Sequence, residues 1–226
     1  MINKPNNVQS NPTTSLPVPA AQPAHPLDYW LSPELSRISP PGAPSRLRQL
    51  ADAQGTLAAA WSSAIGAGPV LILAGGFISA MSVNPAWVLV LGLLGAGLAV
   101  LGVFSWRRTR ATLPNTNRLL ISRGPGSARS GIMMVSVLAA ILGGIMATAL
   151  PGTAARGTST LVTLLGAYFL LVMLLVVCIL VPSVVMGRAR QSFRRRAQSD
   201  PVLRAAVEDD LATWRDPYGS AAYGPL

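Results

Sequence analysis

The hydrophobic residues of this chain gather in four long runs, at residues 61–81, 85–106, 131–150 and 161–186. Each run holds 20 to 26 residues and contains no Asp, Glu, Lys, Arg or His. A helix rises about 1.5 Å per residue, so about 20 residues cross a hydrocarbon core of about 30 Å. A helix of this length on a soluble protein would carry a polar stripe, and none of the four runs has one. The pattern therefore predicts an all-α integral membrane protein with four transmembrane helices.

Composition divides the rest of the chain into distinct parts. Residues 1–45 form a Pro-rich arm, and residues 46–60 have the apolar spacing of a helix that runs directly into the first span. The predicted membrane domain thus covers residues 46–186. The tail, residues 187–226, begins with a basic run. The sequence Ser199-Asp200-Pro201 then predicts the start of an amphipathic helix, with Pro in its first position.

The arginines between the spans alternate sharply from one connection to the next. Residues 107–130 carry six arginines, and residues 188–196 carry five. By contrast, residues 82–84 are uncharged, and residues 151–160 carry only Arg156. Because positively charged connections stay on the cytoplasmic side of a membrane, both termini are expected in the cytoplasm, with cytoplasmic amphipathic helices outside the bilayer.

The net charge of +10 does not require a nucleic acid, because attachment to a membrane explains the basic clusters. A basic surface beside anionic headgroups gains about 1 kcal/mol per Arg. The clusters lack the interleaved aromatic residues and fold signatures of a nucleic-acid-binding module, so we expect no nucleic acid. We expect anionic phospholipid to contact six arginines near the ends of the spans: Arg107, Arg108, Arg110, Arg194, Arg195 and Arg196.

Apolar side chains also occur in the polar arm and tail, where they need a covering surface. In the arm they fall in a segment at 27–39, in which Ser32-Pro33-Glu34 predicts the start of a short helix. In the tail they recur every three or four residues, on one helix face. The covering surface is the chain's own helix ends, the bilayer or a partner protein, of which we favour the partner. The predicted docking residues are Tyr29, Trp30, Leu31, Leu35, Ile38, Leu203, Val207, Leu211 and Trp214.

Small residues are expected at contacts between spans, because helices in lipid gain little from burying apolar surface. The fourth span is almost wholly large and apolar after Ala167, so we expect spans one to three to approach closely and span four to face lipid or another protein. The stripe of small residues on the second span faces its own neighbours, which we favour, or a partner subunit. The expected packing residues are Gly92, Gly95, Ala99, Gly102, Ala140, Gly143 and Gly144.

The chain offers few side chains for chemistry. No Asp or Glu occurs between Asp52 and Asp200, so the spans lack the acids of proton relays and ion sites. The single histidine, His25, lies in the arm, and the single cysteine, Cys178, lies deep in the fourth span. The glycine-rich segment at 123–131 lacks the Lys-Ser/Thr ending of a phosphate-binding loop. We therefore expect no catalytic residue, no cofactor and no metal site, and we do not expect an enzyme.

Three features together give a resemblance to known proteins: the arm sequence LDYWLSPEL, the four uncharged spans, and WRDPYG after the amphipathic helix. The layout resembles the small four-span accessory proteins of actinobacteria, among them subunits associated with the respiratory cytochrome bcc–aa3 supercomplex. The resemblance covers the whole chain as a pattern. It implies a non-catalytic subunit of the bacterial inner membrane that holds larger redox proteins together or shields them. The implied partners are larger integral membrane proteins, such as cytochrome bcc and aa3 oxidase subunits.

Two hypotheses about function follow from these observations. The leading one is a structural or accessory subunit of a bacterial inner-membrane complex, docked through the arm and the tail helix. The alternative is a component of a membrane transporter or permease, whose uncharged spans line a path for a neutral or apolar solute.

Overall fold

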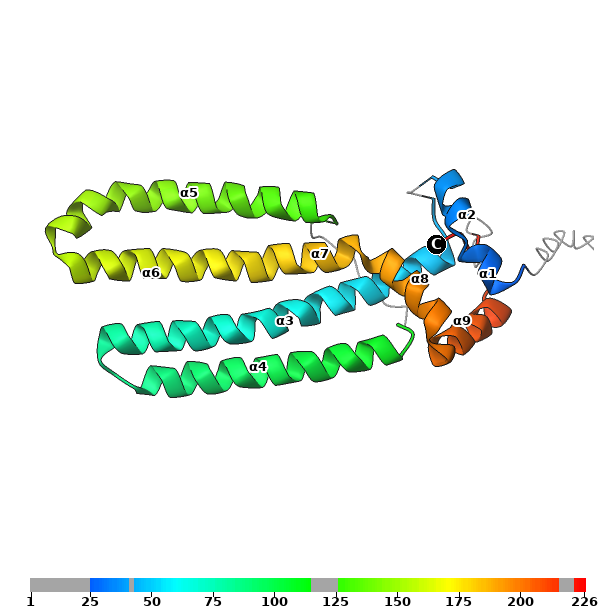
Figure 1. Cartoon of the computed structure of the whole chain (residues 1–226), viewed down its shortest axis with the longest axis horizontal. Coiled ribbons are helices and arrows are strands. Elements are labelled where there is room, and N and C mark those ends of the chain that lie inside the picture. Colours follow the sequence, from blue (N-terminus) through cyan, green and yellow to red (C-terminus); the bar gives the residue numbers. More distant parts are fainter. Residues whose placement is uncertain (1–24, 41–42, 115–125, 216–221) are drawn as a thin grey trace, which may run out of the picture.

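The computed structural model describes residues 25–40, 43–114, 126–215 and 222–226 of the chain. Four long helices run side by side, and a group of short helices sits at one end (Figure 1). We call this group the cap. It consists of α1 (Leu27–Trp30), α2 (Pro33–Ile38), the first turns of α3 (Arg46–Ser82), α8 (Ala189–Ser199), α9 (Pro201–Thr213) and residues 222–226.

Some expectations concern residues outside the described ranges. These are the first 24 residues of the Pro-rich arm, two arginines of the basic connection (Arg118 and Arg123), and residues 216–219 of the WRDPYG segment.

The four long helices confirm an all-α, multi-pass membrane protein. They are α3, α4 (Ala86–Ala111), α5 (Ala128–Ala155), and a fourth span made of α6 (Thr158–Leu175), the π-helical turn η1 (Val176–Leu180) and α7 (Val181–Gly187). Each is long and apolar enough to cross a membrane. In the described ranges these helices are accompanied by no strand, only by an isolated parallel bridge between Ser45 and Ala222.

The first helix of the membrane domain links the cap to the membrane without a break. It begins at Arg46, as its sequence predicts, because the Ser45 hydroxyl accepts a hydrogen bond from the backbone N–H of Arg48 at 3.3 Å. Its 37 residues correspond to a length of about 55 Å, well beyond the hydrocarbon thickness. The first turns of α3 therefore belong to the cap and the remainder to the membrane layer.

The connection at 151–160, which the sequence places between the third and fourth spans as a loop, is largely helical in the structure. Helix α5 continues through Pro151 to Ala155, and α6 begins at Thr158. The turn between them depends on Gly157, whose φ is 112°. Glycine adopts this conformation readily because it has no Cβ. The sequence could not show this, because polar Thr and Ser residues suit the ends of exposed helices as well as loops.

The fourth span contains a π-helical turn just before Pro182. Proline has no N–H to donate to the preceding turn of its helix, and a local change of helix type is a common response. The Ser183 hydroxyl donates to the carbonyl of Ile179 and so satisfies one of the nearby acceptors. Ser183 itself is buried against Gly131, at the start of α5.

The spans lie in a row in the order α4, α3, fourth span and α5 (Figure 1). Helix α3 packs along α4 on one side and along α6, η1 and α7 on the other, whereas α5 packs on the fourth span. The expectation that spans one to three cluster, with span four at the margin, is therefore wrong. The glycines that permit close contact belong to the neighbours of span four: Gly66 of α3 faces Val177, and Gly131 of α5 faces Ser183.

Candidate interaction surfaces

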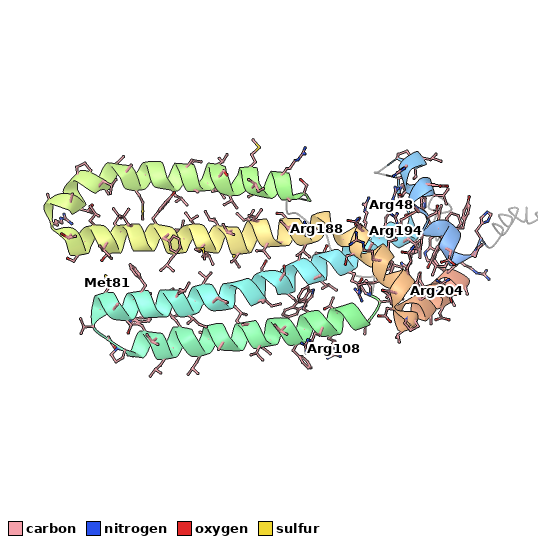
Figure 2. The ribbon with its side chains drawn as sticks, viewed as in Figure 1. Arg48, Met81, Arg108, Arg188, Arg194 and Arg204 are labelled. Atoms are coloured by element: carbon pink, nitrogen blue, oxygen red, sulfur yellow. The ribbon has the colours of Figure 1, made fainter. Side chains whose placement is uncertain are left out.

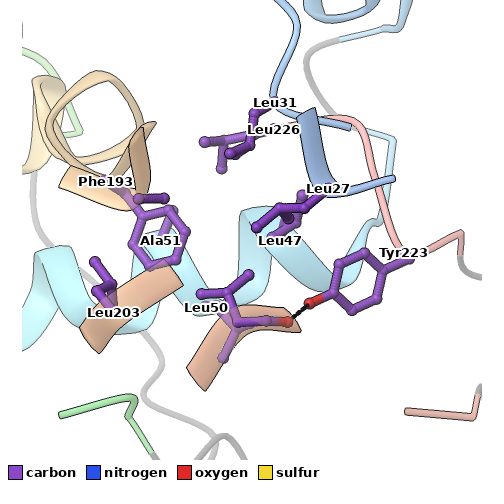
Figure 3. Packing of buried hydrophobic residues seen from close by; sticks show 11 residues of the cluster. Leu27, Leu31, Leu47, Leu50, Ala51, Phe193, Leu203, Tyr223 and Leu226 are labelled. Carbon is purple, nitrogen blue, oxygen red and sulfur yellow. Dashed lines mark hydrogen bonds between the residues drawn. The ribbon is translucent and has the colours of Figure 1, made fainter. Parts of the chain in front are cut away.

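The cap is built around a hydrophobic cluster of its own. Its members come from every part of the cap except α2 (Figure 3). They are Leu27, Leu31, Leu47, Leu50, Ala51, Phe193, Ala197, Leu203, Val207, Tyr223 and Leu226. Because these segments are remote in sequence, burial of the cluster joins both ends of the described chain to the start of the first span.

The tail residues 222–226 complete the N-terminus of α3. The first N–H groups of a helix have no partner within that helix. Here the N–H of Arg46 donates to the Ala222 carbonyl at 3.1 Å, and that of Leu47 donates to the Tyr223 carbonyl at 2.9 Å. The Ser45 hydroxyl donates to the Pro225 carbonyl at 2.8 Å. The tail thus supplies acceptors that would otherwise have to come from water.

A polar network surrounds Tyr223, which is buried in the cap. Its hydroxyl donates to the Val207 carbonyl at 2.9 Å and lies 3.3 Å from a carboxylate oxygen of Asp210. Burial, followed by the charge of Asp210, raises the pKa of Tyr223 well above its ordinary value. Asp210 also accepts two hydrogen bonds from Arg46, at 2.7 and 3.2 Å, and the two side chains are only 19% and 17% exposed. Nothing local in the sequence pairs Tyr223 or Asp210 with α3, so the sequence alone does not indicate this network.

Most of the predicted docking residues of arm and tail lie within the cap. Leu31, Leu203 and Val207 are buried in the cluster, and Trp30, Leu211 and Trp214 pack against it. Leu35 is half-buried. Of the three covering surfaces considered above, the chain itself therefore covers these side chains in the structure.

Two predicted docking residues remain uncovered by the chain. Tyr29 is 42% exposed and Ile38 is 82% exposed. The ring of Tyr29 stacks on His25, with centroids 4.2 Å apart. The arm therefore leaves one aromatic side chain on α1 and one aliphatic side chain on α2 uncovered, and their contact with a partner stays a prediction.

The arginines predicted to contact lipid fall into two groups. Arg107, Arg108 and Arg195 are exposed. The other two described side chains, Arg194 and Arg196, are half-buried and bond within the chain: to the Leu226 carbonyl at 2.8 Å and to the Gln54 side chain at 3.2 Å. Burial lowers the pKa of Arg194. The side chain of Arg110 lies outside the described residues. Figure 2 shows Arg48, Arg108, Arg188, Arg194 and Arg204 toward the cap end, with Met81 at the opposite end.

Neighbouring groups fix the basic segment after the fourth span. Arg190 makes two hydrogen bonds to Asp52 of α3, at 2.7 and 2.9 Å, and these raise the pKa of the Arg190 guanidinium. Helix α9 begins at Pro201, as predicted, and the preceding Asp200 carboxylate accepts hydrogen bonds from the N–H groups of Val202 and Leu203. The Arg190–Asp52 bonds hold α8 against the start of α3. The Asp200 bonds fix the start of α9.

Comparison with family models, with curated proteins and with solved structures gave no match to this chain. The interpretation of its surfaces therefore rests on their own chemistry.

The predicted packing residues on α4 are mostly at the contact with α3. A Cβ built on Gly95 would lie 2.5 Å from the Gly68 carbonyl oxygen, and one built on Gly102 would lie 2.9 Å from Ile65. Ala99 is next to Gly68 at the same crossing. Gly92 faces open space, with nothing within 4 Å of such a Cβ. The backbones of α3 and α4 therefore approach closely at Gly95, Ala99 and Gly102 but not at Gly92.

The predicted packing residues on α5 divide in the same way. Gly143 lies against Tyr168, whose hydroxyl donates to the Ala139 carbonyl at 2.9 Å. Gly144 has nothing within 4 Å of a built Cβ, and Ala140 is exposed. One side of α5 thus packs on the fourth span, and the other side is not covered by the chain.

In the described part of the chain, no three His, Cys, Asp or Glu side chains gather in a group that could hold a metal ion. The acids that are described lie in the cap, where Asp28, Asp52, Glu208 and Asp210 all pair with arginines. A shallow groove of about 340 Å³ lies between α3 and α4, near the cap. What the described surfaces offer is mainly apolar contact along the spans and positive charge near the cap.

Proposed function

We propose that the protein is a non-catalytic accessory subunit of a bacterial inner-membrane complex, with both termini in the cytoplasm. The observation that carries the proposal is the arrangement of the spans in a row. A closed bundle buries one side of every helix in a common core, whereas a row leaves two broad apolar sides uncovered by the chain. Helices in lipid associate through close packing, and such sides suit packing against a larger membrane protein.

The proposed orientation rests on the distribution of charge. The cap end carries the arginines of α8 together with Arg107 and Arg108, while the opposite end of the row carries Arg156 alone among the described basic residues. Positive charge at the cap end supports a cytoplasmic cap by the positive-inside rule.

The proposed contact surfaces are the outer side of α5 and the arm side of the cap. On α5, Met133 and Ile145 are 70% and 62% exposed, and Ala140 and Gly144 between them leave room for a close neighbour. On the cap, Tyr29 and Ile38 extend the surface beyond the membrane. A partner that covers both would be a large integral membrane protein with its own cytoplasmic surface. The cytochrome bcc and aa3 oxidase subunits, to which the resemblance points, are the first candidates.

The proposal is tested by purifying the tagged protein from its native membrane in mild detergent. We expect stoichiometric integral membrane partners, identified by mass spectrometry. Replacing Ala140 and Gly144 together with Leu is expected to release them, because bulk on α5 would block close packing. The matched control replaces Gly97 of α4, another uncovered small residue, with Leu and should retain the partners.

A lone, monodisperse protein from the same membranes would contradict the accessory role. If that lone protein also moved a neutral solute across liposomes, the permease alternative would replace it.

A further inference from the structure

The groove between α3 and α4 has two chemically different parts. Its apolar part is formed by Leu57 and Trp61 of α3 and Phe104 of α4. Its polar part is formed by Arg108, Thr109 and Thr112, near the end of α4. An apolar wall joined to a cationic rim matches a ligand with a hydrocarbon part and an anionic part.

The position of the groove along α4 selects the source of such a ligand. Trp61 and Arg108 lie where the row of spans meets the cap (Figure 2 labels Arg108), the depth at which indoles and arginines meet lipid headgroups. From the groove toward the opposite end, α4 presents large apolar side chains that the chain leaves uncovered. Phe104 is 68% exposed and Leu101 is 61% exposed. An acyl chain could follow this side while its headgroup stays in the groove.

Hydrogen bonding shows which group would hold the anion. The hydroxyls of Thr109 and Thr112 donate to the carbonyls of Ser105 and Arg108, at 2.9 and 3.3 Å. Their protons are thus engaged within α4, and the guanidinium of Arg108 remains as the donor at the rim. In the described part of the chain, Arg108 forms no ion pair with a carboxylate. The planar guanidinium matches the geometry of a phosphate group.

Hydrogen-bond donors also offset the negative charge of the carbonyls at the C-terminal end of α4. A helix C-terminus carries partial negative charge on its last carbonyls, which repels anions. Here the Gln54 amide donates to the carbonyls of Thr109 and Thr112, at 3.2 and 3.5 Å. Gln54 is in turn held by Arg196 at 3.2 Å. These bonds offset the unfavourable charge next to Arg108.

We propose that this groove binds one anionic glycerophospholipid from the cytoplasmic leaflet, independently of any protein partner. Its phosphate sits on Arg108, and one acyl chain lies along Trp61, Phe104 and Leu101. Basic pockets between spans on the cytoplasmic side of membrane proteins commonly bind such lipids. The site differs from general attraction to anionic headgroups, because it holds a single molecule in one place.

The test is native mass spectrometry of the full chain in neutral detergent, titrated with phosphatidylglycerol or phosphatidylcholine. We expect one tightly retained phosphatidylglycerol. Removing the charge-assisted hydrogen bonds, in Arg108→Gln, should weaken its binding by about tenfold or more. The matched control is Arg129→Gln, which removes an exposed arginine at the start of α5, outside the groove. It should change the affinity by less than about threefold, because exposed charges contribute little beyond general attraction.

Two further experiments test whether the bound phosphate belongs to a lipid and whether the apolar part of the groove contributes to binding. Soluble glycerol phosphate should not displace the lipid, and Phe104→Ala should weaken binding while the protein keeps its helical content by circular dichroism. Equal losses in Arg108→Gln and Arg129→Gln would overturn the proposal, because they indicate surface charge alone. Displacement by glycerol phosphate would overturn it as well, since the groove would then be a site for free phosphate. Equal retention of phosphatidylcholine would also contradict it.

Discussion

The cap and the membrane layer of this protein are packed in opposite ways. The cap buries large side chains, such as Leu47, Phe193 and Val207, in a shared cluster. The membrane layer buries few: its close contacts occur at glycines, such as Gly68 against Gly95, and its large residues point away from the chain. In water, apolar surface is driven together. In lipid it is not, and small residues allow the backbone contact that replaces this force. One continuous helix, α3, serves both environments.

The largest effect is expected from a cavity in the cap. Leu47→Ala removes a side chain with 0% exposure, and such changes cost about 2–5 kcal/mol. We expect a lower midpoint of thermal unfolding in detergent and faster amide exchange in α9. The control is Val202→Ala, at a residue that is 70% exposed, which should change stability by less than about 0.5 kcal/mol. Equal effects of the two substitutions would contradict a buried cap core.

A smaller effect is expected where α3 and α4 cross. In Gly95→Ala, the new Cβ meets the Gly68 carbonyl, and overpacking of this kind costs about 1–3 kcal/mol. The separation of spin labels on α3 and α4 should increase. Gly97→Ala is the control, because nothing lies within 4 Å of its Cβ, so the better helix propensity of Ala should stabilise the helix slightly. If Gly95→Ala also stabilised the protein, this would contradict the close contact between the backbones of α3 and α4 at this residue.

The hydroxyl of Tyr223 is expected to give the cap a dependence on alkaline pH. Because burial raises the pKa of the folded phenol, the unfolded phenol ionises first, near pH 10. Its contribution to stability is therefore complete below about pH 10 and declines as the pH rises above that value. Tyr223→Phe should cost about 1 kcal/mol at neutral pH, through the lost hydrogen bond. It should also lack the alkaline decline. Parallel unfolding midpoints for both proteins from pH 8 to pH 11 would count against the buried network.

The smallest effect is expected at the exposed pair of Arg190 and Asp52. Their side chains are 43% and 44% exposed, so solvent screens the attraction. Arg190→Gln should reduce stability by less than about 1 kcal/mol and less so at high salt. The comparison is Arg46→Gln, which leaves Asp210 half-buried without its bidentate partner and should cost more. The free energy of unfolding, measured in low and high salt, would distinguish the two ion pairs. A larger loss of stability in Arg190→Gln than in Arg46→Gln would contradict the expectation that the exposed pair contributes less.

The sequence predicted what depends on local signals. Composition predicts the four spans. Neighbouring residues predict the helix starts at Arg46 and after Asp200, and the N-cap residue Ser32 of the short helix α2. The order of the spans was not predicted, because Gly66 and Gly131 do not reveal which helix they face. The tail at 222–226 was missed for a related reason: its backbone groups pair with α3 residues about 180 positions away. The docking residues were predicted from apolar spacing, which does not distinguish a partner from another part of the same chain.

Hydrogen exchange on the isolated protein in detergent, free of any partner, tests most directly whether the cap folds on itself. We expect strong protection of the amides of α9 and of Leu47, whose N–H donates to the Tyr223 carbonyl. We also expect this protection to be the same before and after partner proteins are added. Exchange of these amides at the rate of an unfolded chain, with protection appearing only in the complex, would contradict a self-folded cap and show that a partner forms it.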